Sequence, residues 1–332
     1  MIIPRFLRDG DRIGVTAPSF GVTEPTDIAR FDHAKEKLGS LGFGVVETPD
    51  VYAADETGRS APAEQRVREF YSLLEDPEVG AVVSAKGGDY QFEMLLHMDW
   101  DLLERHSKWI QGYSDNTTLL FKITAEHDIA TIYGGNFGDF GMEPWHRSVS
   151  ESLEFLRGVR KGQDSFPRHE VGFSDRVTGL EPLNPMAPTV WRSTSGDTTF
   201  SGRLIGGCMD VLEWFHRKAT ASPKAFNDRY SKDGTVWYME TYEMDEARIR
   251  RMLSGMSKDG WFEGVNGFVF GRPLFYEGSD YMETVTDALS EYGVPLVFDA
   301  DVGHKAPRMT FINGAESRFD IRDGACHLEY TL

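Results

Sequence analysis

The sequence predicts an α/β protein with a parallel-sheet N-terminal domain and a smaller, β-rich α+β domain after it. Through the first half, short apolar segments alternate with amphipathic helical segments, which favours a parallel sheet with helices on both faces. In the second half the expected strands are more numerous and their order with helices is less regular. The chain has 332 residues, which suits two domains better than one core.

The first half contains five apolar segments of strand length, separated by helical patterns. The expected strands are Arg12–Pro18, Phe43–Glu47, Ala81–Ala85, Trp109–Gln111 and Ile129–Tyr133. The expected helices are Asp27–Leu41, Ala63–Leu74 and Leu119–Glu126, with one or two short helices within Gln91–Arg105. Apolar residues recur at helical spacing from Ile28 to Leu41, and Gly42 then suits the helix C-cap.

Residues 158–201 are polar and rich in proline, which predicts a linker or an extended loop. We therefore expect the first domain at 1–160, the linker at 161–200 and the second domain at 201–332. The expected strands there are Phe200–Ile205, Thr235–Met239, Gly267–Phe270, Pro295–Phe298 and Arg308–Ile312. The expected helices are Met209–Phe215, Glu246–Met256 and Ser279–Tyr292, and Phe319–Leu332 reads as a closing hairpin around Asp323-Gly324.

Composition excludes several classes of protein. The net charge of −18, from 35 basic and 53 acidic residues, argues against nucleic acid and anionic membrane surfaces as partners. The two cysteines form no CxxC pair, so neither a disulfide framework nor a cysteine metal site is expected. The charged N-terminal segment lacks a signal-peptide core, and no apolar run approaches the ~20 residues of a membrane helix. We expect a soluble cytoplasmic protein.

The segment Lys108–Leu120, KWIQGYSDNTTLL, predicts a strand, a tight turn at Ser114 and then a helix. Such a turn can hold a serine hydroxyl clear of the backbone and leave amide N–H groups free to bind an oxyanion. The alternative is an ordinary helix cap, because Ser, Asp, Asn and Thr all suit that position. The glycine turn Gly87-Gly88 follows a neighbouring strand, so it should lie beside Ser114 at the carboxyl edge of the sheet.

Two further residues follow apolar strands and complete a candidate catalytic set. Glu240 is the last residue of the apolar segment TVWYME, and a buried carboxylate there needs a partner. Glu243 is the other nearby candidate for the role of the acid. His304 follows the strand that precedes Asp299, and a metal site with the nearby aspartates lacks a second histidine. The order Ser, acid, His occurs in hydrolytic triads.

The backbone amides of Gly88 and Asp115 are the candidate oxyanion donors. The turn reads G-Y-S-D-N and has Asn116 where G-x-S-x-G requires glycine, which disfavours an ordinary α/β-hydrolase. Neither Lys86-Gly-Gly-Asp nor Tyr133-Gly-Gly-Asn matches a dinucleotide fingerprint or a P-loop.

The chain resembles the LD-carboxypeptidase family of serine peptidases, which includes muramoyltetrapeptide carboxypeptidases and microcin C immunity peptidases. The motifs are LRDGDRIGVTAPS, KGGDY, IQGYSDNTTLL, RLIGG, WYMETYEMDEARIRRML and VGHKAPRMTFINGA, in this order. The resemblance implies Ser114 as nucleophile, Glu240 as acid and His304 as base. It also implies a Rossmann-like N-terminal domain that carries the serine, a C-terminal domain that carries the other two, a homodimer, and no metal or other cofactor.

Two departures from the family pattern leave the substrate open: Cys208-Met209 follows RLIGG, and Thr310–Gly314 replaces the usual final motif. The expected substrate is a murein tetrapeptide or a peptidyl-nucleotide-like amide. Trp191, in a polar loop, could stack on a nucleobase or instead plug the space between domains.

A substrate carboxylate needs a cation, and the candidates are Lys86, Lys305 and Arg308. The competing class is a non-catalytic two-domain protein that binds its ligand without hydrolysing it. We favour a peptidase, because the serine, the acid and the base are all present in one chain.

Overall fold

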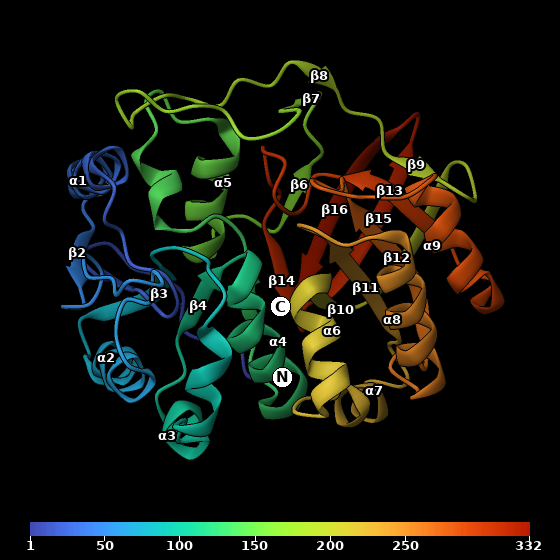
Figure 1. The fold of residues 1–332 in the computed structure, drawn as a ribbon, viewed down its shortest axis with the longest axis horizontal. Helices are drawn as coiled ribbons and strands as arrows, with labels where there is room; N and C mark the ends of the chain where they lie inside the picture. The colour runs from blue at the N-terminus through green and yellow to red at the C-terminus, as the bar shows by residue number, and fades with distance from the viewer.

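Two large β-sheets organise the molecule in the computed structural model, which describes residues 1–332 (Figure 1). The first sheet has six strands in the order β14-β5-β4-β3-β1-β2. Its strands from the N-terminal half are all parallel, and β14 pairs antiparallel with β5. The second sheet has eight strands in the order β6-β16-β15-β10-β11-β12-β13-β9. The predicted fold class, a parallel-sheet N-terminal domain and a second sheet-rich domain, is confirmed.

The first half follows the predicted alternation closely. Its strands are β1 (Arg12–Thr16), β2 (Gly44–Glu47), β3 (Val79–Ser84), β4 (Trp109–Gly112) and β5 (Thr131–Tyr133). Its helices are α1 (Pro25–Ser40), α2 (Ala63–Glu75), α3 (Trp100–Arg105), α4 (Thr117–His127) and α5 (Arg147–Leu156). Short 3₁₀ turns are η1 (Gln91–Leu96), η2 (Ser114–Asn116) and η3 (Phe137–Gly141). Helix α5 was not predicted, because its apolar face rests on few residues, Val149, Leu153 and Leu156, within a polar stretch.

The second half mixes strand directions. Its first strands are β6 (Gly162–Asp164), β7 (Arg168–His169), β8 (Ala187–Pro188), β9 (Arg192–Ser193) and β10 (Thr198–Cys208). Then come α6 (Met209–Lys218), α7 (Lys224–Arg229), β11 (Thr235–Glu240), α8 (Glu246–Lys258), β12 (Val265–Gly271), α9 (Tyr281–Leu289) and η4 (Ser290–Tyr292). The last elements are β13 (Leu296–Ala300), β14 (Phe311–Asn313), β15 (Glu316–Arg322) and β16 (Ala325–Thr331). None of these helices, nor those of the first half, has the combination of length and apolar character that a membrane crossing requires.

The closing hairpin is present as predicted, and its turn explains the sequence there. Strands β15 and β16 are antiparallel, with Arg322 paired to Ala325. Asp323 and Gly324 both have positive φ, +50° and +76°, as a two-residue hairpin turn requires. Asp-Gly is a favoured sequence for that turn because both residue types tolerate the left-handed region.

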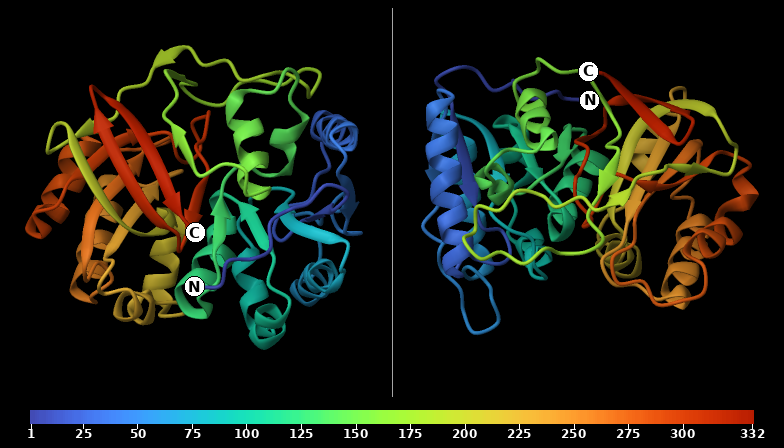
Figure 2. Two further views of the ribbon diagram at one scale, coloured as in Figure 1. Left: turned by 180° about the vertical axis from the view of Figure 1, so that it is seen from behind. Right: turned by 90° about the horizontal axis from the view of Figure 1, so that it is seen from above.

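The two halves interlock more than the sequence indicated. The segment predicted as a strand of the second domain, Arg308–Ile312, contributes β14, which completes the edge of the first sheet. Conversely, β6 from the predicted linker pairs with β16 in the second sheet. Strand β9, also from the predicted linker, pairs with β13 at the other edge of that sheet. The segment between β6 and β9 runs along the top of the molecule, with β7 and β8 pairing there (Figures 1 and 2). The domain limits at 160 and 200 stay predictions.

Strand β11 lies in the interior of the second sheet and is buried along its whole length, which explains its nearly continuous apolar sequence. Val236 and Tyr238 belong to the core shared with the first half, whereas Trp237 and Met239 pack with α6, α8 and α9. Helix α4 lies at the centre, against β10 and α6 (Figure 1). This packing sets the N-terminal end of α4, where Ser114 lies, beside the carboxyl ends of β10 and β11.

Candidate active site

Ser114 lies in a sharp turn between β4 and α4, as the sequence predicted. Its φ is +61°, which is uncommon for a residue other than glycine and marks a strained backbone. The backbone N–H of Ser114 donates to the Tyr133 hydroxyl at 3.0 Å. The Ser114 carbonyl accepts from Thr117 at 2.6 Å, which fixes the start of α4. The turn therefore holds the serine at the cleft, and Asn116, which precedes α4, makes no side-chain capping hydrogen bond to the helix.

The structure brings Ser114, His304 and Glu240 together in one hydrogen-bonded chain. His304 Nε2 lies 2.9 Å from Ser114 Oγ, although the residues are 190 positions apart. His304 Nδ1 lies 2.8 Å from Glu240 Oε2. With the Nδ1 proton donated to the carboxylate, Nε2 is left to accept the serine proton, which is the arrangement that activates a serine hydroxyl.

Two tyrosines hold the His304 ring in place. The ring centroid of Tyr113 lies 5.3 Å from that of His304, in an edge-to-face contact. The Tyr242 ring lies 4.9 Å from His304 on the other domain. His304 itself is buried. Because the ring is packed from both domains, its two nitrogens keep their separate partners.

Glu240 is fully buried at the end of β11, and both of its carboxylate oxygens are hydrogen-bonded. Burial by itself raises the pKa of this group. The charge of His304 and the hydrogen bonds from His304 and Tyr133 outweigh burial, so the Glu240 pKa lies below its ordinary value. The acid is therefore ionised at neutral pH. The competitor, Glu243, is exposed and does not contact His304.

Cys208 is the cross-strand neighbour of Glu240, in the register of β10 with β11. Its thiol lies 3.4 Å from Asp210 Oδ2. Burial and the nearby charges of Glu240 and Asp210 raise the pKa of the thiol well above its usual range. Cys208 therefore stays protonated and is no nucleophile of its own.

The glycine turn lies beside Ser114, as predicted. A Cβ added to Gly87 would lie 3.4 Å from Ser114 Oγ and 3.9 Å from the backbone nitrogen of Asp115. Gly88 has φ +149°, and both candidate oxyanion donors, Gly88 and Asp115, line the cleft. The Asp115 carboxylate accepts from the backbone N–H groups of Tyr90 and Gln91 at 3.0 and 2.9 Å. It thereby ties the loop that carries Gly88 to the serine turn.

Asp115 is itself unusual, because its side chain is buried beside the site. Burial raises its pKa to about 6, although hydrogen bonds from Ser19 and from the Tyr90 and Gln91 amides act in the opposite direction. The charge of Asp89 adds to the increase. Asp115, which holds the loop that carries Gly88, therefore changes its protonation state near pH 6.

Ser114 and His304 open onto a cleft of about 670 Å³ between the two halves, which is large enough for a small peptide or nucleotide. Phe20, Phe92 and Lys86 line it from the first half, and Val211, Trp214, Tyr242, Glu243 and Arg248 from the second. The rings of Phe92 and Trp214 meet across the halves at 5.0 Å. Phe173 reaches the same cleft from the crossing loop.

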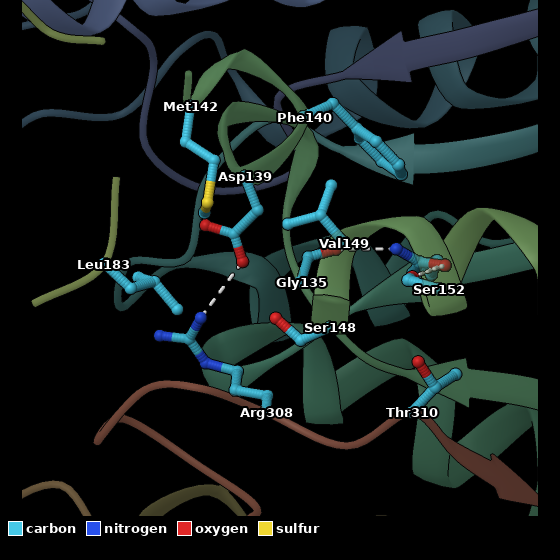
Figure 3. A pocket seen from close by; sticks show the side chains of 11 residues that line it. Gly135, Asp139, Phe140, Met142, Ser148, Val149, Ser152, Leu183, Arg308 and Thr310 are labelled. Atoms are coloured by element: carbon cyan, nitrogen blue, oxygen red, sulfur yellow. Dashed lines mark hydrogen bonds and ion pairs between the residues drawn. The ribbon is translucent and has the colours of Figure 1, made fainter. Parts of the chain in front are cut away.

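Of the three predicted cations, only Lys86 lines the cleft, where its Nζ pairs with Asp27 at 2.8 Å. Arg308 is a correction to the prediction. Its guanidinium pairs with Asp139 at 3.0 Å, lies over the Tyr113 ring and faces a separate cavity of about 20 Å³ (Figure 3). That volume holds about one water molecule. Arg308 thus contacts Tyr113, which packs against His304, and does not face the cleft.

Lys305 also lies off the cleft lining and is half-buried. Burial and the neighbouring Arg272 lower the pKa of its amine. The cation that sequence reasoning missed is Arg248, whose guanidinium pairs with Glu213 at 2.7 Å at the cleft wall. It was hidden in the helical pattern DEARIRRML, where one arginine of several faces the cleft.

The placement of Trp191 as a stacking residue is wrong. Trp191 is 2% exposed, and its indole N–H donates to Asp301 Oδ2 at 3.2 Å, away from the cleft. Trp191 is instead part of the buried core that both halves share, as the plug interpretation expects. The loop aromatic that does reach the cleft is Phe173, which is 59% exposed and lies 6.4 Å from the Tyr242 and Phe275 rings. A lone phenylalanine in EVGFSD carries no sequence signal that distinguishes it from Trp191.

The aspartates near His304 are occupied by arginines. Asp301 is buried and pairs with Arg272 at 2.8 Å, and Asp299 pairs with Arg192 at 2.5 Å. No group of three or more His, Cys, Asp or Glu side chains in residues 1–332 is arranged to hold a metal ion. The two aspartates therefore anchor the loop before His304.

These features define a two-domain α/β protein with a Ser–His–Glu site in the cleft between its halves. Residues 13–134 match the family model described as LD-carboxypeptidase N-terminal domain, and residues 201–319 match the LD-carboxypeptidase C-terminal domain. A Treponema pallidum protein with a provisional carboxypeptidase name is 34% identical over 329 residues, 95% of this chain and 91% of that protein. The chain belongs to the LD-carboxypeptidase family, as its motifs indicated.

Two further relatives have names that point to different substrates. The microcin C7 self-immunity protein MccF of Escherichia coli is 25% identical over 331 residues, 95% of this chain and 92% of that protein. A "Probable murein peptide carboxypeptidase" of Bacillus subtilis is 24% identical over 338 residues, 98% of this chain and 94% of that protein. The solved structure of wild-type MccF without ligand has a TM-score of 0.83 and 21% identity, and covers 100% of this chain and 99% of its own. The fold is therefore shared with MccF along the whole chain.

Proposed function

We propose that this protein is a serine peptidase that hydrolyses an amide bond beside a terminal carboxylate, through a Ser114–His304–Glu240 triad. The observation that carries the proposal is the hydrogen-bonded chain from Ser114 Oγ through both ring nitrogens of His304 to Glu240. A non-catalytic binding protein would have no need of this arrangement, which costs a strained serine and a buried charge.

In the proposed reaction, Ser114 Oγ attacks the amide carbonyl while His304 Nε2 takes the serine proton. The backbone N–H groups of Gly88 and Asp115 bind the oxyanion, and Glu240 stabilises the protonated imidazole. His304 then protonates the leaving amine, and the acyl group stays on Ser114. A water molecule, deprotonated by His304, releases the acyl group in the second half of the reaction.

The proposed substrate is a murein tetrapeptide that loses its terminal D-residue, in line with the name of the Bacillus subtilis relative. Lys86 and Arg248 are the cations on the cleft lining, and both are paired with a carboxylate. Lys86 is partly exposed, so a substrate carboxylate can replace Asp27 as its partner. We propose Lys86 as the anchor for the terminal carboxylate.

A second candidate substrate is a peptidyl- or aminoacyl-nucleotide amide, and one observation favours it. Phe173 exposes its ring at the cleft, where a flat group could stack on it. Solved MccF structures contain aspartyl sulfamoyl adenosine and glutamyl sulfamoyl guanosine. The murein reaction would serve peptide recycling, and the nucleotide reaction would serve immunity or detoxification.

The test compares wild type, Ser114→Ala and Glu240→Gln on a murein tetrapeptide and on an aminoacyl-sulfamoyl adenosine. Both variants should lose about 10³–10⁴-fold or more in kcat while binding the substrate, measured by calorimetry. Equal hydrolysis by Ser114→Ala and wild type would contradict the mechanism. Binding without hydrolysis by wild type on both substrates would favour the ligand-binding alternative.

We further propose that the enzyme works in the cytoplasm as a homodimer. The family resemblance supports the dimer, and the acidic composition, which favours solubility, supports the location. Light scattering of the purified protein at micromolar concentration measures the oligomeric state, and a monomer mass there would contradict the proposed dimer.

A further inference from the structure

Tyr133 links Ser114 to Glu240 through hydrogen bonds that do not involve His304. Its hydroxyl donates to Glu240 Oε1 at 2.5 Å and accepts from the backbone N–H of Ser114 at 3.0 Å. Tyr133 ends β5 in the first sheet, and Glu240 ends β11 in the second. One hydroxyl therefore spans the junction between the halves at the point where the proposed catalytic groups meet.

The geometry leaves each partner of Tyr133 dependent on it. Glu240 is fully buried, and its other oxygen is taken by His304, so Tyr133 supplies the donor that Oε1 needs. The Ser114 amide belongs to a residue with φ +61°, so its hydrogen bond helps to hold the strained turn. A buried donor or acceptor that loses its partner costs about 1–3 kcal/mol.

The hydroxyl keeps its proton throughout. Burial, and next the charge of Glu240, raise the pKa of Tyr133 well above its ordinary value. The side chain is 1% exposed, and its ring packs 5.3 Å from Tyr238. Tyr133 thus acts as a fixed donor to the carboxylate and a fixed acceptor for the amide.

We propose that Tyr133 is a positioning residue for the triad, which sets the orientation and basicity of Glu240 and fixes the Ser114 turn relative to it. This inference rests on the proposed function of the triad. The chain N–H···O–H···carboxylate is polarised along its length, so each bond strengthens the other. The donor to Oε1 withdraws electron density from the carboxylate and limits how tightly Glu240 holds a protonated His304.

Removal of the Tyr133 hydroxyl should shift the pH dependence of catalysis in one direction. In Tyr133→Phe the ring remains but Oε1 loses its donor, so the carboxylate becomes more basic and holds the imidazolium more tightly. The acidic limb of kcat/KM should then move to higher pH, by about half a pH unit. The freed Ser114 amide loosens the turn, so kcat should fall about 10–100-fold while KM stays within about twofold.

Tyr238→Phe is the matched control. Tyr238 is a buried neighbour whose hydroxyl donates to Asn313 at 2.8 Å and makes no contact with the triad. Both variants remove one buried hydroxyl and should lower the melting temperature, Tyr133→Phe by more, because it leaves two buried partners unbonded where Tyr238→Phe leaves one. Only Tyr133→Phe should change kcat and the pH profile. An equal fall in kcat in the two variants, or an unchanged pH profile of kcat/KM in Tyr133→Phe, would overturn the proposal.

A measurement that needs no substrate separates this inference from the proposed function. The ¹⁵N resonances of the His304 ring, assigned by their loss in His304→Gln, should titrate at higher pH in Tyr133→Phe than in wild type. If wild type hydrolyses neither substrate, the proposed function fails, but the titration still decides the role of Tyr133.

A nearly isosteric probe covers the case in which Tyr133→Phe does not fold. 3-Fluorotyrosine at position 133 makes the hydroxyl a stronger donor, so the His304 titration should move to lower pH. No movement, or movement to higher pH, would contradict the proposal.

Discussion

Gly303 and Glu240 lie so close together that position 303 has no room for a side chain. A Cβ on Gly303 would lie 2.6 Å from Glu240 Oε2, and the φ of Gly303 is +103°. The next residue is His304, whose Nδ1 contacts the same oxygen at 2.8 Å. Glycine at 303 therefore lets the backbone turn against the acid and deliver the imidazole to it.

The first prediction concerns this turn. Gly303→Ala should displace Glu240 or His304 and reduce kcat/KM at least about 100-fold, because small misplacements of proposed catalytic groups are costly. Steady-state kinetics and thermal unfolding measure the two effects. Gly42→Ala is the control, since φ there is +88° but no atom lies within 4 Å of the added Cβ. It should cost about 1 kcal/mol of stability and no activity; similar activity in the two variants would contradict the prediction.

The sequence predicted those parts of the fold that depend on local pattern. Strands and helices of the first half repeat with clear periods, and Asp323-Gly324 marks its hairpin directly. The pairing of β14 with β5 was not predictable, because Phe311–Asn313 is short and apolar and its partner lies far along the chain. Only the packed structure decides which sheet such a strand joins.

In the candidate site, too, some residues were predictable from the sequence and others were not. Ser114, Glu240 and His304 could be found because each stands at the end of an apolar strand. A polar or charged side chain at such a position needs a reason, and catalysis is one. Tyr133 could not be found, because an aromatic residue at the end of a strand is ordinary core. Trp191 was misplaced for the reverse reason: an aromatic residue in a polar loop suits a ligand and a plug equally well until its burial is known.

The second prediction separates Gly87 from Gly88. A Cβ on Gly87 would point at Ser114 Oγ from 3.4 Å, so Gly87→Ala should fold normally and lose activity by crowding the substrate carbonyl. A Cβ on Gly88 would lie 2.3 Å from Ser19 Oγ, at φ +149°. Gly88→Ala should therefore lose both stability and activity. Kinetics and chemical unfolding of the pair test this; a stable, fully active Gly88→Ala would contradict the crowding and strain expected at position 88.

The third prediction concerns stability against pH. The Asp115 pKa is raised by burial to about 6, above its value of about 3.9 in an unfolded chain. The folded protein thus binds this proton more tightly, and the stability that the protonated form contributes is complete below pH ~4. It is lost as the pH rises through 6, by about 3 kcal/mol for two pH units. The free energy of unfolding of wild type should fall relative to Asp115→Asn over this range.

Urea unfolding of both proteins from pH 4 to pH 7 measures this difference. Asp50 also has a raised pKa, about 7, through burial and Glu69, but it is present in both proteins and cancels in the comparison. Asparagine can still accept from the Tyr90 and Gln91 amides, so the loop contact is kept. A difference that does not change with pH would show that Asp115 titrates normally.

The last prediction assigns the two loop aromatics to different tasks. Trp191→Phe removes the indole N–H that donates to Asp301, a buried carboxylate, and should lower stability by about 1–3 kcal/mol. It should change hydrolysis of murein and nucleotide substrates equally. Phe173→Ala removes a ring that is 59% exposed at the cleft, so stability should change little.

Kinetics on both substrate classes then reveal what Phe173 contacts. If a nucleobase stacks on its ring, Phe173→Ala should lower kcat/KM for the aminoacyl-sulfamoyl adenosine by about tenfold, because such a contact is worth about 1–3 kcal/mol. Phe173→Tyr, which keeps a flat ring, should restore most of the loss. An equal effect of Phe173→Ala on the murein tetrapeptide would instead assign Phe173 to general closure of the cleft, since a peptide that ends in D-alanine offers no ring for stacking.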